Sequence, residues 1–170
     1  MRSLREDLGA RLQGRVCLVG VGNPDRGDDG FGVRLAGTMR DLGYPDAILA
    51  ERSPERWLGR LARGGFQSVL FLDAVETGAA PGAVVFLECA QIAARYPQVS
   101  THKLSLGTLA RLIEADGSTR AFLLGVQAQS IALGSELSAP VRTTMDVLRD
   151  VLAETLIPGT ESLLVCEDRP

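Results

Sequence analysis

Two adjacent carboxylates, Asp28 and Asp29, stand in a glycine-rich turn between a predicted strand and a predicted helix. The turn reads Gly-Val-Gly-Asn-Pro-Asp-Arg-Gly-Asp-Asp-Gly-Phe-Gly over residues 20–32 and follows an apolar run at 16–19. In an open α/β sheet such turns lie at the carboxyl ends of the strands, where ligands bind. The turn is therefore a candidate functional site, although both acids could instead cap the helix and favour its positive end.

The spacing of the glycines argues against nucleotide binding. The dinucleotide fingerprint Gly-x-Gly-x-x-Gly would need a third glycine where this chain has Asp25, because that glycine lets helix and strand pack closely. A P-loop also fails, since no Gly-Lys-Ser/Thr follows. The three acids of the turn would repel a phosphate, whereas phosphate-binding loops collect donors and positive charge.

Two further residues could act together with this turn. Asp73 ends the apolar run 68–73, and His102, the one histidine of the chain, lies in a loop before a predicted helix. If the second strand flanks the first on one side and the third on the other, Asp29 and Asp73 converge at a switch point of the sheet. A lone histidine is more often structural than a ligand. Two aspartates and a histidine from three loops can nevertheless form an open site for a borderline divalent metal.

Alternating strands and helices must position these residues. Strands are expected at 15–21, 47–51, 68–73, 83–87 and 120–126, and helices within 1–14, over 28–42, from Ser53, over 90–95, over 104–115 and from Ser138. This alternation predicts a single three-layer α/β/α domain over 1–157 with a five-stranded, mostly parallel sheet. The fourth strand follows the third so closely that we expect it to run antiparallel to it, since parallel pairing needs a longer crossover. Residues 158–170 are expected to form a mobile tail.

Composition limits the classes of function. The chain has 170 residues, a net charge of −3 and no basic cluster, which argues against nucleic-acid binding. No apolar run approaches the roughly 20 residues of a membrane span, and the charged N-terminus does not resemble a signal peptide. Cys17, Cys89 and Cys166 lie far apart, which indicates reduced thiols in the cytoplasm and no cysteine metal site. We expect a cytoplasmic monomer.

Four motifs, taken in order, resemble those of the hydrogenase maturation proteases, endopeptidases that trim the large subunit of nickel–iron hydrogenases. They are Gly-Val-Gly-Asn-x-x-x-Gly-Asp-Asp-Gly-x-Gly-Val-Arg from Gly20, Leu-Asp-Ala-Val-Glu from Leu72 followed by Pro81-Gly82, Ser-Thr-His from Ser100, and Leu-Leu-Gly-Val-Gln from Leu123. Each motif is weak alone, but all four at these separations are specific, and together they cover about residues 16–156.

The resemblance implies a site and a reaction. In that family an acid of the first motif, the aspartate of the second and the histidine of the third bind metal, which implies that Asp29, Asp73 and His102 are the metal-binding and catalytic residues here. Asp28 is the alternative to Asp29, or else a residue at the helix start or one that supports the metal ligands without binding the metal. The resemblance further implies an endopeptidase that removes the C-terminal extension of the large-subunit precursor after nickel insertion, with the divalent metal, nickel, supplied by the substrate. The alternative is a non-catalytic checkpoint protein that binds the nickel-loaded precursor.

Two positions depart from the family pattern. Many relatives carry an acid-Gly-Gly-Thr segment after the second strand, thought to help recognise the substrate, where this chain has Glu51–Trp57. Many also place a proline after the position of Gln127, where this chain has Ala128. We assign Gln127 no catalytic role.

Overall fold

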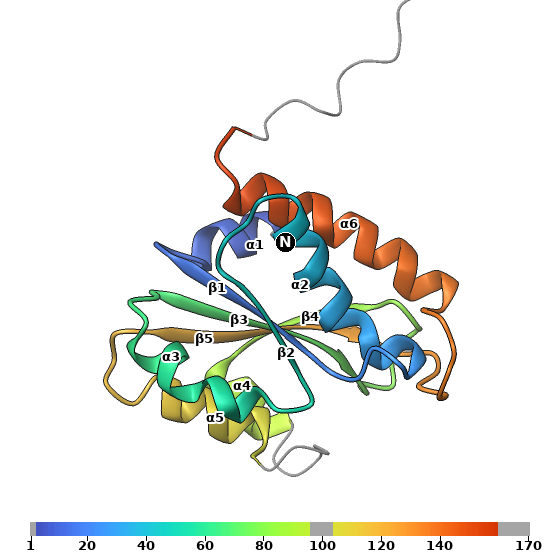
Figure 1. Cartoon of the computed structure of the whole chain (residues 1–170), viewed down its shortest axis with the longest axis horizontal. Helices are drawn as coiled ribbons and strands as arrows, with labels where there is room; N and C mark the ends of the chain where they lie inside the picture. The colour runs from blue at the N-terminus through green and yellow to red at the C-terminus, as the bar shows by residue number, and fades with distance from the viewer. Residues whose placement is uncertain (1–2, 96–103, 160–170) are drawn as a thin grey trace, which may run out of the picture.

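The computed structural model describes residues 3–95 and 104–159. A five-stranded sheet lies between two layers of helices (Figure 1). The strands are β1 (Val16–Val21), β2 (Ala47–Glu51), β3 (Ser68–Val75), β4 (Val84–Glu88) and β5 (Arg120–Gln127). Their order across the sheet is β2-β1-β3-β5-β4. All neighbouring strands are parallel except β4, which runs antiparallel to β5. The predicted fold class is confirmed.

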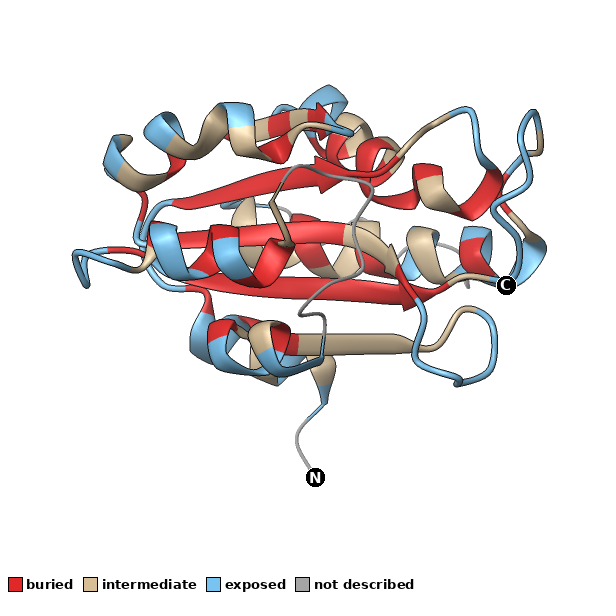
Figure 2. Cartoon of the chain, turned by 90° about the horizontal axis from the view of Figure 1, so that it is seen from below, coloured by how far each residue is buried: buried red, intermediate tan, exposed pale blue. Residues whose placement is uncertain are grey.

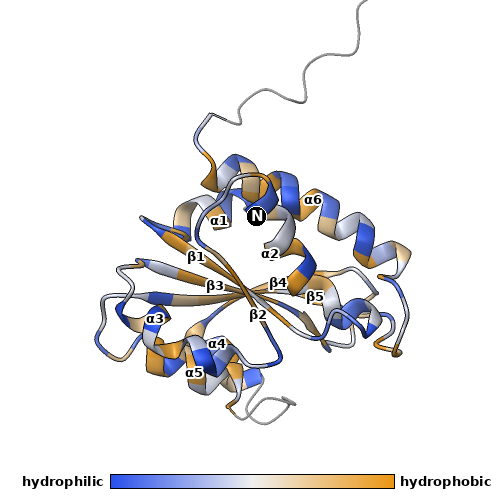
Figure 3. Cartoon of the chain, in the orientation of Figure 1, coloured by the Kyte–Doolittle hydropathy of each residue, from blue (hydrophilic) through white to orange (hydrophobic). Residues whose placement is uncertain are grey.

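Helices cover both faces of the sheet. On one face lie α1 (Leu4–Arg11), α2 (Phe31–Asp41) and α6 (Ala139–Leu156), and on the other α3 (Leu58–Arg63), α4 (Cys89–Arg95) and α5 (Leu106–Ile113) (Figure 1). The strands are mostly buried (Figure 2), whereas hydrophobic and hydrophilic residues alternate along the helices (Figure 3). Within the described residues, no helix is long and apolar enough to cross a membrane.

The central strand β3 shows how the two layers divide the core. Leu70 and Leu72 belong to the hydrophobic cluster under α2 and α6, whereas Val69, Phe71 and Val75 belong to the cluster under α3, α4 and α5. This division follows from the alternation of side chains along a strand. Asp73 therefore shares the face of β3 that α4 and α5 cover.

The expected position of β4 was wrong in one respect. Its neighbour is β5 and not β3, because β5 inserts between them. The connection over 76–83 is long enough to reach past one strand position, about 10 Å from β3 to β4. The Gly82 N–H donates to the carbonyl of Gln127 at 2.9 Å, and the Gln127 N–H donates to the carbonyl of Ala83 at 2.8 Å. The connection is thus fixed to β5, a strand that comes later in the chain.

Several boundaries also differ from those expected. β3 continues two residues past Asp73 because its ladder with β5 extends to Val75 and Gln127. The helix expected over 28–42 begins as a 3₁₀ turn, η1 (Gly27–Gly30), and the helix expected from Ser53 begins as η2 (Pro54–Trp57). Residues 96–103 and 160–170, which include His102 and most of the predicted tail, lie outside the described residues.

Candidate active site

The glycine-rich turn lies at the carboxyl end of β1, as the sequence predicts. Gly22 has φ of 115°, and a side chain there would collide with the backbone oxygen of Asp29. The Gly22 N–H donates to the carbonyl of Glu51 at 3.0 Å, which ties the turn to the end of β2. Glycine at this position therefore allows the chain to fold back and place Asp29 over the strand ends.

Helix α2 starts unusually close to the sheet. A side chain on Gly32 would collide with the carbonyl oxygen of Leu72, and one on Gly20 would meet the carbonyl oxygen of Gly32. Asp29 comes two residues before α2, and Asp73 directly follows Leu72. The close packing at Gly32 therefore brings the segments that carry these two acids together, although they are far apart in sequence.

The charge of Asp29 acts on Asp73. Both residues are partly buried, and Oδ2 of Asp29 accepts a hydrogen bond from the Asn23 N–H at 2.9 Å. Withdrawal from water, followed by the negative charge of Asp29, raises the pKa of Asp73 to about 8, despite an opposing hydrogen bond from the Ala74 N–H. The protonated form of Asp73 is therefore favoured far above the pH range in which a free carboxyl ionises.

His102, the third predicted site residue, lies outside the described residues, so its place beside the two acids is still a prediction. The helices that precede and follow it in the chain, α4 and α5, pack on the face of the sheet to which Asp73 belongs. Within 3–95 and 104–159, no three His, Cys, Asp or Glu side chains form a cluster that could hold a metal. The structure thus brings together two of the three predicted residues.

Asp28 lies at the helix start, in η1, as expected, but its carboxylate does not cap the helix. It is fully buried (0 % exposed), and its carboxylate accepts four hydrogen bonds, from the backbone N–H groups of Gln129 (2.8 Å), Ser130 (3.0 Å) and Ser138 (2.7 Å) and from the Ser138 hydroxyl (2.9 Å). Burial alone would raise the pKa of Asp28, but these hydrogen bonds outweigh it and lower the pKa. Neither η1 nor α2 has a side-chain cap, so the helix-cap interpretation was wrong.

The donors to Asp28 come from the loop between β5 and α6, residues 128–138. Backbone hydrogen bonds add to this contact: the Asp28 N–H donates to the Ser130 carbonyl (2.9 Å), and the Gly134 N–H donates to the Asp25 carbonyl (2.7 Å). Both oxygens of the Asp28 carboxylate are engaged, which argues against it as the alternative metal ligand. Sequence reasoning missed this loop because its partner is about a hundred residues away and no local pattern signals the contact.

Gln127 fixes the neighbouring connection between β3 and β4. Its side chain is buried; Oε1 accepts from the N–H (2.7 Å) and the hydroxyl (2.9 Å) of Thr77, and Nε2 donates to Glu76 at 3.1 Å. These contacts give Gln127 a structural role at the carboxyl end of β5.

The described cysteines are poorly suited to nucleophilic catalysis. Cys17 and Cys89 are both buried free thiols. Burial raises the pKa of the Cys17 thiol to about 12, so the reactive thiolate is scarce at neutral pH.

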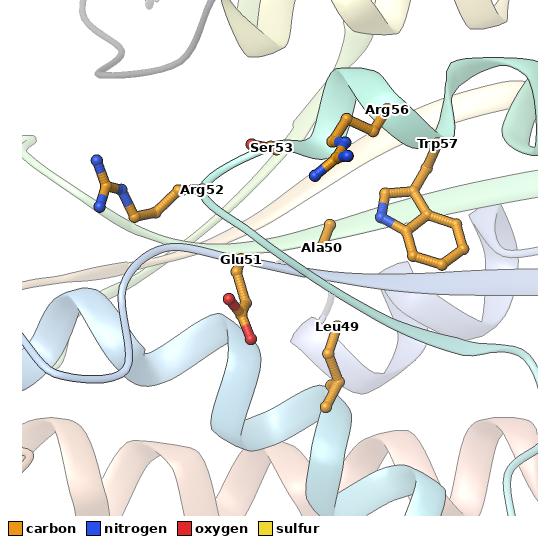
Figure 4. Close-up of a pocket in the computed structure, with 7 residues that line it drawn as sticks. All are labelled: Leu49, Ala50, Glu51, Arg52, Ser53, Arg56 and Trp57. Atoms are coloured by element: carbon orange, nitrogen blue, oxygen red, sulfur yellow. The ribbon is translucent and has the colours of Figure 1, made fainter.

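A hollow of about 430 Å³ opens beside the end of β2 (Figure 4). It is lined by Leu49, Ala50, Glu51, Arg52, Ser53, Arg56 and Trp57. These residues include most of the segment Glu51–Trp57 that departs from the family pattern. The sequence singled out the segment but gave no sign of the hollow. Glu51, where the segment begins, is the one non-glycine residue with positive φ among those described (51°).

Comparisons with known proteins agree with this geometry. Residues 53–154 match the family model described as hydrogenase maturation protease, HycI. The crystal structure of the [NiFe] hydrogenase maturation protease HycI from Thermococcus kodakarensis KOD1 is 30% identical, covers 91% of this chain and 99% of its own, and superposes with a TM-score of 0.79. The chain belongs to the hydrogenase maturation protease family.

Two more distant structures share the fold. The hydrogenase maturating endopeptidase HybD from E. coli is 24% identical, with a TM-score of 0.69 over 83% of this chain and 91% of its own. The endopeptidase HycI from Escherichia coli is 21% identical, with a TM-score of 0.66 over 80% of this chain and 87% of its own. No curated protein matches the chain in sequence.

Proposed function

We propose that this protein is an endopeptidase that removes the C-terminal extension of the large-subunit precursor of a nickel–iron hydrogenase after nickel has been inserted. Membership of the maturation protease family supports the reaction class. The observation that carries the proposal for this chain is the meeting of Asp29 and Asp73 where β1 and β3 end, at the switch point of the sheet.

The donors at this position suit a divalent cation. Asp29 and Asp73 offer carboxylate oxygens and His102 would add an imidazole nitrogen, a set that binds nickel and similar ions. The Asp29 charge makes ionisation of Asp73 unfavourable, and a divalent cation between the two carboxylates would remove that cost. In this proposal nickel belongs to the substrate, where it can polarise the scissile carbonyl or lower the pKa of an attacking water.

The residues of the chain hold this arrangement before the substrate arrives. The Asn23 N–H orients the Asp29 carboxylate, and pairing of Asp73 with Gly125 in the β3–β5 ladder fixes the backbone that carries the second acid. A site held by strands and a hydrogen-bonded turn is oriented more firmly than one on a free loop. The chain would therefore present two oriented oxygen ligands to a metal that the substrate already holds in part.

The test is cleavage of a nickel-loaded large-subunit precursor by purified protein. Asp29→Asn, Asp73→Asn and His102→Ala should each abolish cleavage. Asp25→Asn, which alters an exposed acid of the same turn, is the matched control and should cleave normally. Full activity of His102→Ala would overturn the proposed mechanism, and a wild-type protein that binds the precursor without cutting it would favour the checkpoint function.

A further inference from the structure

Strand β2 forms one edge of the sheet and, among the described strands, pairs only with β1. The parallel register places Leu18 opposite Ala47 and Gly20 opposite Leu49. In a parallel ladder this register directs the backbone N–H and C=O groups of Ala47 and Leu49 away from β1. Neither residue has another backbone partner among those described. β2 therefore presents a row of open hydrogen-bonding groups, which is the template that an added strand requires.

The hollow beside β2 runs along this open edge. Leu49 packs against the cluster under α2, whereas Ala50 belongs to the cluster on the opposite face of the sheet, and both residues line the hollow. In Figure 4 the side chains of Leu49 and Glu51 lie on one side of the strand, and Arg56 and Trp57 lie on the other. The hollow is lined by side chains from both faces of β2. It therefore lies where the next strand of the sheet would pack beside β2.

The charge around the hollow is opposite to that of the whole protein. The charged residues that line the hollow are Arg52, Arg56 and Glu51, an excess of one positive charge, whereas the chain carries −3. Arg56 is exposed and forms no ion pair with another described residue. The guanidinium of Arg60 lies 5.8 Å from the centre of the Trp57 ring, which holds the indole against a cation. These features complement an acidic ligand.

We propose that the open edge of β2 binds an extended, acidic segment of the substrate precursor as an additional strand. Backbone hydrogen bonds to Leu49 fix the register of the bound segment against β2, and Arg56 and Trp57 contact the side chains of that segment. This inference rests on the proposed function, because the bound segment belongs to the protein that is cut.

The position of β2 sets how far the recognised residues lie from the cleavage point. The carbonyl of Glu51 accepts from Gly22 N–H, so the end of β2 adjoins the turn of Asp29. Strands lie about 4.8 Å apart, which places an added strand roughly 14 Å from β3. Since an extended chain spans about 3.4 Å per residue, the bound segment begins on the order of four residues from a peptide bond held at Asp73.

Trp57 allows this binding to be measured without any cleavage, because it is the only tryptophan of the chain. The probe is a synthetic peptide with blocked ends, Thr-Val-Glu-Val-Asp-Thr. It should change the tryptophan fluorescence saturably and slow hydrogen exchange at the Leu49 amide. Its neutral counterpart, Thr-Val-Gln-Val-Asn-Thr, and a form N-methylated at two consecutive residues should each bind at least tenfold more weakly.

Matched variants separate this inference from the proposed function. Arg56→Gln should weaken binding of the acidic peptide at least tenfold, whereas Arg63→Gln, which lies outside the hollow, should bind like the wild type. Asp29→Asn should bind the peptide normally although it no longer cleaves the precursor. Peptide binding can therefore be judged even if the cleavage assay of the proposed function fails. Unchanged fluorescence, wild-type binding by Arg56→Gln, or a dimer whose Leu49 amide is protected before peptide is added would each overturn the inference.

Discussion

Asp28 and Asp29 are neighbours in one turn, yet their surroundings are opposite. Asp28 is fully buried with four hydrogen-bond donors, and its pKa is lowered. Asp29 accepts one hydrogen bond from the described residues and faces Asp73, whose pKa is raised to about 8. Burial disfavours the charged form of both Asp28 and Asp73. The number of hydrogen-bond donors therefore decides whether the pKa is lowered or raised. Asp28, with four donors, holds the turn against the 128–138 loop, whereas Asp29 and Asp73 have fewer donors and are the pair to which the proposed function assigns cation binding.

The largest expected effect is on activity, from Asp73→Asn. The amide keeps the size of the side chain but removes the charge that a cation needs, so cleavage of nickel-loaded precursor should fall roughly 10³-fold or more. The melting temperature should not fall, because burial and the charge of Asp29 already disfavour the charged form of Asp73, and the amide is neutral as well. Single-turnover cleavage and circular dichroism melting measure the two effects. A clear loss of stability without loss of cleavage would assign Asp73 to the scaffold instead.

Asp28→Asn should show the reverse pattern. The asparagine amide would place its N–H groups against the backbone N–H donors, and these donors would lose their acceptor. The free energy of unfolding should fall by about 3 kcal/mol. This is more than the roughly 1 kcal/mol typical of a lost helix cap. Urea unfolding measures the change, with Asp25→Asn as the exposed control, expected within about 0.5 kcal/mol of the wild type. A cost for Asp28→Asn below that of a cap would contradict its role as an anchor of the 128–138 loop.

Ser138→Ala should have a smaller effect on the same contact. It removes the hydroxyl donor but keeps the Ser138 N–H, so the carboxylate loses one of four hydrogen bonds, worth about 1 kcal/mol. In the Asp28→Asn background the same substitution should cost less, because the two residues share one interaction. Full additivity in a double-mutant cycle would show that they act independently.

The smallest effect concerns pH. The pKa of Asp28 is lower in the folded protein than the value of about 3.9 expected when unfolded. Its ionisation therefore stabilises the fold fully above that unfolded value, and the contribution is lost as the pH falls through the folded pKa. Urea unfolding of the wild type and Asp28→Asn at pH 7, 5 and 3 should show a difference that holds from 7 to 5 and shrinks at 3. A difference that grew at pH 3 would contradict the direction of this shift.

Local patterns predicted most of the fold. The bounds of β2 agree with the expected 47–51, and β1 begins only one residue later than expected, because apolar runs bounded by turns define them. The convergence of Asp29 and Asp73 was made conditional on the order β2, β1, β3, and the sheet has that order. Those features depend on residues close in sequence or on general rules of α/β sheets.

The features that were missed depend on distant contacts. The position of β4 is decided by β5, more than thirty residues later, and the role of Asp28 by a loop about a hundred residues away. Ser138 was expected to start the last helix and occupies its N-cap position, but its hydroxyl donates to Asp28 and accepts no hydrogen bond from the helix backbone. The sequence contains no signal for this, because serine is typical of an N-cap whichever partner its hydroxyl takes.

The contact between Asp28 and residues 129–138 also orders events during synthesis. The turn that carries Asp29 leaves the ribosome early, but its hydrogen-bond donors emerge only after most of the chain has been made. Strand β5 likewise comes late in the chain. It is the second neighbour of β3 and, among the described strands, the only neighbour of β4. A nascent chain shorter than about 138 residues therefore lacks a finished site. The turn beside Asp29 therefore gains its anchor late, only after the 128–138 loop has been made.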